Sequence, residues 1–189
     1  VNSTLYKILF INNSTGLIFG NNGVILRTTN GGFNWTTQTS GTTQLIRDAY
    51  YVNPNIIYAV GGSSGSNSLI LKSTNEGLSW ISQVSPVSQN LNSVHFINSV
   101  IGIAIGNGGT IVRTSNGGSN WSLRASGTTV NLNGVAFRDN LKGFAVGETS
   151  TLLYSTDAGL NWGIQTGVSG NFKTIKFKNA TEGYFGGPG

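Results

Sequence analysis

RTSNGGSNW, residues 113–121, is the stretch that decides the fold, because the chain carries it four times with little change. The other copies are RTTNGGFNW (27–35), KSTNEGLSW (72–80) and YSTDAGLNW (154–162). They end in Trp35, Trp80, Trp121 and Trp162, which are all the tryptophans of the chain and follow one another at intervals of 45, 41 and 41 residues. A period of this length in a chain of short strands is typical of a propeller, in which each repeat forms one blade.

The third repeat shows how one blade is built from four short strands. These are expected at LNSVHFIN (91–98), IGIAIGN (101–107), TIVRTSN (110–116) and NWSLRAS (120–126). Each is rich in β-branched or aromatic residues and is bounded by Gly or Asn. The short connections favour antiparallel pairing in chain order, and the pattern contains no helix longer than one turn.

The same frame divides the whole chain into blades. Further first strands are expected at 5–12, 46–53, 132–139 and 172–179, and complete blades at about 5–42, 45–86, 91–127 and 132–167. The stretches NFKTIKFKN and EGYFGGPG then form a partial blade at 172–189. The sequence predicts an all-β fold in which residues 1–189 are a single β-propeller or part of one. It has four complete blades of four antiparallel strands and the first half of a fifth.

A flat β-sandwich is the main rival to the propeller. Strands such as GIAIG (102–106) and GFAVG (143–147) are apolar on both faces, as expected for sheets that are covered on both sides. Blades that stand face to face around an axis supply that cover. A sandwich would require neither the period nor the identical turn in each unit.

The repeated nine residues, called the box below, link the third strand of each blade to the fourth. The Asn or Asp side chain can accept a hydrogen bond from the N–H two residues on, and the glycine two residues later suits a positive φ. The hydroxyl lies near the same turn, and the tryptophan can pack beneath it. The structural box residues are Thr28, Asn30, Gly32, Trp35, Ser73, Asn75, Gly77, Trp80, Thr114, Asn116, Gly118, Trp121, Ser155, Asp157, Gly159 and Trp162. Because every position has a role in folding, the box is interpreted as scaffold.

These residues resemble a known pattern. Ser/Thr-x-Asp-x-Gly-x-x-Trp is the Asp box of bacterial neuraminidase repeats, here with Asn in three of the four copies. The wider frame LNGVAFRDNLKGFAVGETSTLLYSTDAGLNW (132–162) looks like the photosystem II stability/assembly-factor-like repeats. The resemblance implies a β-propeller whose boxes lie at the blade periphery. Such propellers serve as sialidases, other glycosidases, lectins, assembly factors and surface modules, so the resemblance is specific for fold and weak for function.

The acidic residues offer little material for catalysis. Glu76 and Asp157 belong to boxes, and Asp139 stands at a turn position that is Asn in other repeats. Asp48 and Glu148 remain as the alternative, a paired-carboxylate glycosidase. His95, the only histidine, is interpreted as a packed or channel-lining residue rather than a ligand. No catalytic residue, cofactor or metal site is expected.

The charge pattern is the most suggestive functional feature. The net charge is +5, and Arg27, Lys72 and Arg113 occupy one repeat position just before the box, where the fourth copy has Tyr154. Radial repetition predicts a basic arc that attracts acidic protein segments, acidic glycans or anionic surfaces. The alternative is that these residues only solubilise strand ends. Lys173, Lys176 and Lys178 form a separate cluster.

The function expected from these features is a non-catalytic binding or scaffold module that presents loops to a protein or glycan partner. The alternative is a carbohydrate-active enzyme, sialidase-like or glycosidase-like, or a lectin. Nucleic acid is not an expected partner, because the basic residues are sparse and no aromatic and basic RNA-binding sheet is apparent.

Composition adds expectations about location and completeness. Only 9% of residues are charged, against roughly 25% in ordinary domains, and the chain has no Cys and no Met. With no apolar run of 18 residues, no transmembrane segment is expected. The Asn- and Thr-rich surface favours an extracytoplasmic setting: secreted, on the cell surface, or periplasmic or lumenal. The chain is expected to be a processed product or a fragment. It should belong to a larger propeller of five or more blades, or close by self-association or against another chain, since an open stack leaves apolar faces in water.

Overall fold

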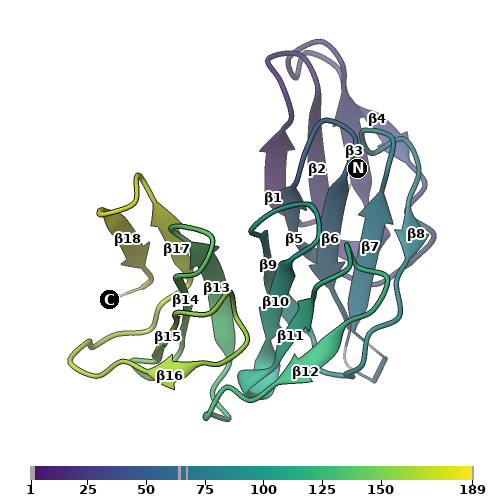
Figure 1. Cartoon of the computed structure of the whole chain (residues 1–189). Coiled ribbons are helices and arrows are strands. Elements are labelled where there is room, and N and C mark those ends of the chain that lie inside the picture. Colours follow the sequence, from purple (N-terminus) through teal and green to yellow (C-terminus); the bar gives the residue numbers. More distant parts are fainter. Residues whose placement is uncertain (1–2, 64, 67, 189) are drawn as a thin grey trace. The chain divides into compact units, whose positions relative to one another are not determined.

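The structure is a computed structural model that describes residues 3–63, 65–66 and 68–188. Strands within these residues pair into four four-stranded sheets and one two-stranded sheet. They belong to two compact units, an N-terminal unit, Val1–Asn90, and a C-terminal unit, Leu91–Gly189. Figure 1 shows the strands of each sheet side by side in chain order.

The N-terminal unit contains two complete blades. Blade 1 consists of β1 (Leu5–Phe10), β2 (Gly16–Gly20), β3 (Ile25–Thr28) and β4 (Thr36–Gln38), with the short 3-10 helix η1 (Asn21–Gly23) between β2 and β3. Blade 2 consists of β5 (Ile46–Tyr51), β6 (Ile57–Gly61), β7 (Leu69–Ser73) and β8 (Ile81–Ser82).

The C-terminal unit contains two further blades and a two-stranded sheet. Blade 3 consists of β9 (Leu91–Phe96), β10 (Gly102–Gly106), η2 (Asn107–Gly109), β11 (Ile111–Thr114) and β12 (Ser122–Arg124). Blade 4 consists of β13 (Leu132–Phe137), β14 (Gly143–Gly147), β15 (Leu152–Ser155) and β16 (Gly163–Ile164). The half-blade consists of β17 (Thr174–Phe177) and β18 (Gly183–Gly186).

All pairings within these sheets are antiparallel between strands consecutive in the chain. This confirms the predicted fold class, a β-propeller of four-stranded antiparallel blades with four complete blades and the first half of a fifth. The assignment of residues 1–189 to one propeller domain stays a prediction.

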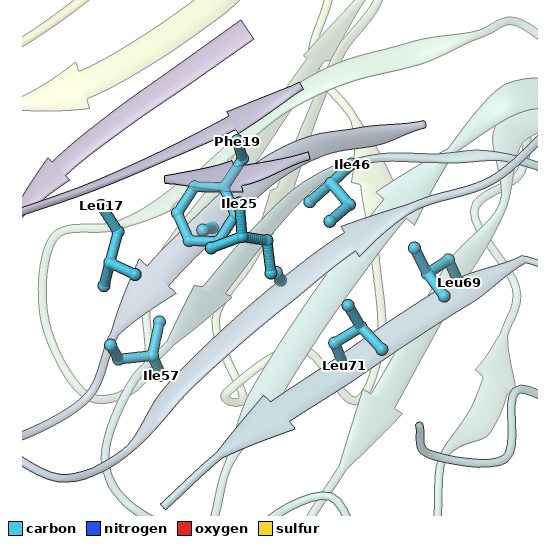
Figure 2. Close-up of a cluster of buried hydrophobic side chains, with 9 residues drawn as sticks. Leu17, Phe19, Ile25, Ile46, Ile57, Leu69 and Leu71 are labelled. Atoms are coloured by element: carbon cyan, nitrogen blue, oxygen red, sulfur yellow. The ribbon is translucent and has the colours of Figure 1, made fainter. Parts of the chain in front are cut away.

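Within each unit the blades pack face to face through apolar side chains. In the N-terminal unit, Leu17, Phe19 and Ile25 of blade 1 pack against a set from blade 2 that includes Ile46 and Leu71 (Figure 2). In the C-terminal unit, residues of blades 3 and 4 form a second core, and residues of blade 4 and the half-blade form a third. First strands of adjacent blades, β1 with β5, β9 with β13 and β13 with β17, lie against one another.

A β-bulge recurs at the second residue of the first strand. The register skips Tyr6 between Leu5 and Lys7, and it skips the corresponding residues of the other complete blades, Arg47, Asn92 and Asn133. Because a bulge re-aims the side chain of the extra residue, this position departs from the strict alternation of a strand. It is the position on which the candidate binding surface is built.

Candidate binding surface

The four boxes share one hydrogen-bond pattern. In the third copy, the Thr114 hydroxyl accepts the N–H of Gly118 at 2.9 Å and donates to Oδ1 of Asn116 at 3.0 Å. Oδ1 of Asn116 accepts the N–H of Asn120 at 2.9 Å. Equivalent bonds start from Thr28, Ser73 and Ser155. All four hydroxyl residues are at most 2% exposed, so this part of the box serves its own turn.

The turn geometry differs in one detail from the sequence prediction. The Asx oxygen accepts from the N–H four residues on, next to the tryptophan, instead of the N–H two residues on. The reason is that both central residues of the turn have positive φ. The expected glycines do, with φ of 95°, 80°, 80° and 77° at Gly32, Gly77, Gly118 and Gly159. The residue before each of these glycines also has a positive φ. In two boxes this residue is not glycine: it is Glu76, with a φ of 58°, or Ala158, with a φ of 59°.

Each box tryptophan packs edge-on against a phenylalanine. The pairs Phe10–Trp35, Phe96–Trp121 and Phe137–Trp162 have ring centroids 6.2, 6.0 and 6.1 Å apart. A glycine of the second strand lies beneath each phenylalanine, at Gly16, Gly102 and Gly143, where an added Cβ would come within 2.8 Å of the ring or closer. Blade 2 carries Tyr51 and Ile57 at these positions, and Trp80 packs instead on Phe19, at 5.7 Å.

The basic arc is not an open row of charges. Arg27 donates through Nε to the Glu76 carbonyl at 3.1 Å, and its Nη2 lies 3.3 Å from the Glu76 carboxylate. Arg113 is 7% exposed and donates through Nε to the Ala158 carbonyl at 2.9 Å. Both reach the same turn position in the box of the next blade.

The two arginines of the arc are less exposed than the sequence predicted. Burial, with Arg124 nearby and Asp157 opposing, lowers the pKa of Arg113. Lys72 lies 5.4 Å above the ring centroid of Tyr58, in its own blade. The side chains of Arg27 and Arg113 are long enough to reach the box turn of the next blade, so both form contacts between blades. Anion binding by Arg27, Lys72 and Arg113 stays a prediction.

The two carboxylates considered for catalysis are both engaged in ion pairs. Asp48 Oδ1 lies 2.6 Å from Lys7 Nζ. Glu148 lies 3.1 Å from Lys173 Nζ, and its other oxygen accepts from Asn131 Nδ2 at 3.2 Å. They lie in different units of the chain.

His95 packs as the sequence suggested. Its ring lies 5.6 Å from that of Phe137, tilted by 30°, and the residue is half-buried. In the part of the chain that the structure describes, no group of three or more His, Asp or Glu side chains is placed to hold a metal ion. None of the described helices is long and apolar enough to cross a membrane.

The bulged position of the first strands carries the most varied chemistry. In the C-terminal unit, Asn92 Nδ2 donates to the Leu132 carbonyl and Asn133 Nδ2 donates to the Phe172 carbonyl, both at 2.8 Å. These amides join the first strand of blade 3 to that of blade 4, and the first strand of blade 4 to the residue two positions before β17. The corresponding residue before β17 is Lys173.

In the N-terminal unit the bulged position is occupied by an exposed pair. The Arg47 guanidinium lies 5.5 Å above the Tyr6 ring, and Tyr6 is 44% exposed. Among the described residues, no carboxylate lies within ion-pair distance of Arg47. The Lys7–Asp48 ion pair is adjacent, and burial raises the pKa of Tyr50 on the same strand. We call Tyr6, Lys7, Arg47 and Asp48 the first-strand surface.

Sequence reasoning missed this surface. The aligned first strands place Tyr6, Arg47, Asn92, Asn133 and Lys173 in one register, and that alignment was the available signal. The bulge that exposes the first two was not visible in the pattern.

No family model matches the chain, and no curated protein matches it. Among solved structures, YCF48 from Cyanidioschyzon merolae aligns with a TM-score of 0.75 and 19% identity over 97% of this chain and 64% of that one. YCF48 bound to D1 peptide aligns at 0.55 and 16%, over 97% of this chain and 90% of that one. The GH74 xyloglucanase from Xanthomonas campestris aligns with a TM-score of 0.71 and 15% identity, over 90% of this chain and 31% of that one.

The chain therefore spans less than two thirds of the first of these proteins. Identities this low establish the fold and nothing finer. The chain has the β-propeller fold in common with YCF48 and with the GH74 xyloglucanase.

Proposed function

We propose that this chain is a non-catalytic binding module whose first-strand surface takes a carboxylate-bearing segment of a protein partner. The observation that carries the proposal is the exposed Arg47 stacked over Tyr6 with no acidic partner among the described residues. Arg and Tyr are the residue types that most often dominate protein interfaces. The stacking orders the guanidinium in advance and leaves its N–H groups for a bidentate carboxylate contact.

Two further observations support a binding role. The box side chains bind within their own turns, and the arginines of the arc bind the next box, so neither is left for a reaction. One structural neighbour, YCF48, is described as bound to a D1 peptide. By analogy, this propeller is proposed to present a surface to a protein segment.

A random-peptide display library tests the proposal. We expect the wild-type chain to enrich peptides that share an acidic residue, and Arg47→Gln to weaken their binding by about tenfold, which is the loss of one charge-assisted contact. Lys142→Gln, which changes an exposed lysine in a turn of blade 4, is the matched control and should leave binding unchanged. Equal losses in the two variants would contradict the proposal.

The alternative function is a glycosidase or a lectin. It is favoured by the fold shared with GH74 enzymes and by an open hollow of about 740 Å³ in the N-terminal unit. Side chains that can hydrogen-bond to sugars line this hollow, including Gln38, Ser40, Thr42 and Gln44. A glycan array with a sialidase and endoglycanase panel separates the readings. Turnover that is lost in Asp48→Asn or Glu148→Gln would replace the binding module with an enzyme.

We further propose an extracytoplasmic location. The support is compositional: a chain with 9% charged residues and no Cys. Fractionation of the source cells with an antibody to the chain tests it, and recovery in the cytoplasmic fraction alone would contradict it.

A further inference from the structure

The repeat gives the joint between blades 1 and 2 and the joint between blades 3 and 4 the same architecture. On the third and fourth strands of blade 1, Ile25 lies opposite Gln38, and Arg27 lies opposite Thr36. Opposite residues of paired strands share one face of the sheet, and so do residues two positions apart on one strand. Because Ile25 belongs to the core shared with blade 2, the face that carries Arg27 and Gln38 is directed towards blade 2.

Blade 3 presents the matching set of residues to blade 4. Ile111, which belongs to the core shared with blade 4, lies opposite Arg124, and Arg113 lies opposite Ser122. Arg113 and Arg124 are therefore diagonal neighbours on this face, at a spacing that long side chains can span. Nη2 of Arg124 donates to the Ser122 hydroxyl at 3.1 Å. Blade 3 thus has a second arginine where blade 1 has a glutamine.

The two joints also differ at one position of the box turn. Arg27 donates through Nε to the Glu76 carbonyl, and its Nη2 lies 3.3 Å from the Glu76 carboxylate. Arg113 makes the same Nε bond to the Ala158 carbonyl, but the alanine has no carboxylate. The first joint therefore combines one arginine with one carboxylate at these positions, whereas the second combines two arginines with none.

Among the described residues, neither Arg113 nor Arg124 forms an ion pair with a carboxylate. Arg113 is 7% exposed, and burial and the charge of Arg124 lower its pKa against the opposing effect of Asp157. The Asp157 carboxylate is instead bound within its own box, by Ser155 and Asn161. Nε of Arg124 is buried with no hydrogen-bond partner among the described residues. Because an unpaired buried donor costs free energy, this joint lacks an acceptor.

We propose that the joint between blades 3 and 4 binds a small oxyanion, a carboxylate or phosphate group, between the guanidinium groups of Arg113 and Arg124. The anion takes the place that the Glu76 carboxylate holds beside Arg27 at the other joint. The Glu76 side chain is 42% exposed, so this place in the repeat is open to solvent, and Ala158 ends at Cβ and does not fill it. Guanidinium groups bind such oxyanions through two N–H donors. The inference does not depend on the proposed function.

Thermal unfolding of the full chain at rising concentrations of inorganic phosphate, with chloride holding the ionic strength constant, measures the binding. We expect a saturable rise in melting temperature, because an anion that binds only the folded chain stabilises it by mass action. A parallel series with acetate shows which of the two groups the site prefers. A saturable response to either anion supports the proposal.

Ala158→Glu is the most direct variant, because it gives the second joint the carboxylate that the first joint has. The backbone suits the change, since φ is 59° at Ala158 and 58° at Glu76. We expect this variant to melt at a higher temperature than the wild type in the absence of phosphate. The saturable response to phosphate should be lost, because the new carboxylate occupies the site.

Arg124→Gln restores the residue type of blade 1 and should raise the phosphate concentration at half-saturation about tenfold or more, since one charge-assisted contact is lost. Arg138→Gln is the matched control. Arg138 is a half-buried arginine of blade 4 whose Nε already lies 3.4 Å from the Asp139 carboxylate, so its loss should leave half-saturation unchanged.

Nuclear magnetic resonance of the arginine Nε–H groups locates the anion independently of stability. Phosphate should shift the resonances of Arg113 and Arg124 along one saturation curve and leave that of Arg138 in place. If Ala158→Glu melts below the wild type, these shifts and the Arg124→Gln variant decide the question.

Two results would overturn the proposal. One is a rise in melting temperature that does not saturate and is equal in the wild type, Ala158→Glu and Arg124→Gln, because phosphate strengthens apolar burial in any protein. The other is a saturable response that Arg124→Gln leaves unchanged while the Nε–H resonances of Arg113 and Arg124 do not shift. That result would place the anion elsewhere on the chain.

Discussion

The Thr114 hydroxyl makes two hydrogen bonds within its box turn. It is buried, accepts the Gly118 N–H and donates to Asn116. The same position is serine in two of the four boxes, so a hydroxyl is required there and the methyl group is not.

Thr114→Ala is therefore expected to destabilise the chain by about 1–3 kcal/mol, because a buried N–H loses its acceptor. Thr114→Ser should cost far less. Urea unfolding of the three proteins measures the difference. An alanine variant as stable as the serine variant would show that the hydroxyl bonds contribute nothing net.

Asp157 is the carboxylic acid at a box position where the other three boxes carry asparagine. Desolvation favours its protonated form, but hydrogen bonds from the Asn161 N–H and side chain, from Ser155 and from the Leu160 N–H outweigh it and lower its pKa. A carboxyl whose folded-state pKa is depressed adds stability above its unfolded value, near 3.8, and loses it as the pH falls through the folded value.

Asp157→Asn, the residue found in the other three boxes, should remove this dependence. We expect the free energy of unfolding of the wild type to fall relative to that of the variant as the pH is lowered from 6 to below about 4. Thermal melts across pH 2.5–6 test this. A difference that does not change with pH would contradict the argument.

Blades are joined by side chains that leave one sheet and end in the turn of the next. Arg27 and Arg113 do this in separate units of the chain, and each donates to the carbonyl of a positive-φ residue. Asn92 and Asn133 also reach the next repeat, where they donate to the carbonyls of Leu132 and Phe172. The contacts repeat because the repeat places the same atoms opposite each other.

Arg113→Gln should lower the melting temperature, because it removes the bond to Ala158 and the buried stem of the side chain, at a cost of about 1–3 kcal/mol. Arg124→Gln, at a half-buried arginine of the same blade, is the control and should change it little. The triple change of Arg27, Lys72 and Arg113 to Gln distinguishes an anion-binding role of the arc from a role in contacts between blades.

An unchanged melting temperature, together with anion binding that is weaker and depends less on salt, would support the anion-binding role.

At the scale of the whole molecule, the first strand of blade 1 is more exposed than that of blade 2, its neighbour in the N-terminal unit. Leu5 and Ile8 are 45% and 56% exposed. The residues at these positions in blade 2, Ile46 and Ala49, are at most 2% exposed beneath blade 1. An apolar sheet face left open in this way marks an interaction surface or an aggregation liability.

We expect the chain to bind an apolar-surface dye through this face or to self-associate. The double variant Ile8→Asp with Leu5→Asn should reduce either effect by more than half. Sedimentation with dye fluorescence measures both. A dye-free monomer with a folded blade 1 would contradict this expectation.

What the sequence determined by itself was the repeat and its local chemistry. Box residues, strand order and blade number follow from alternation and turn residues, whose partners lie within about ten positions along the chain. That is why the roles of Gly32 and Trp162 could be expected from the pattern, while the hydrogen-bond register of the Asx side chain was off by two residues.

Tertiary structure decided where side chains go once blades stack. Arg27 looked like a free surface charge, yet it binds a box 49 residues away, because face-to-face packing brings that turn within reach. The bulge recurs in every complete blade, but Arg47 is exposed there whereas Asn92 and Asn133 are half-buried. A repeated sequence specifies every blade alike, whereas the covering of each face depends on the blade beside it.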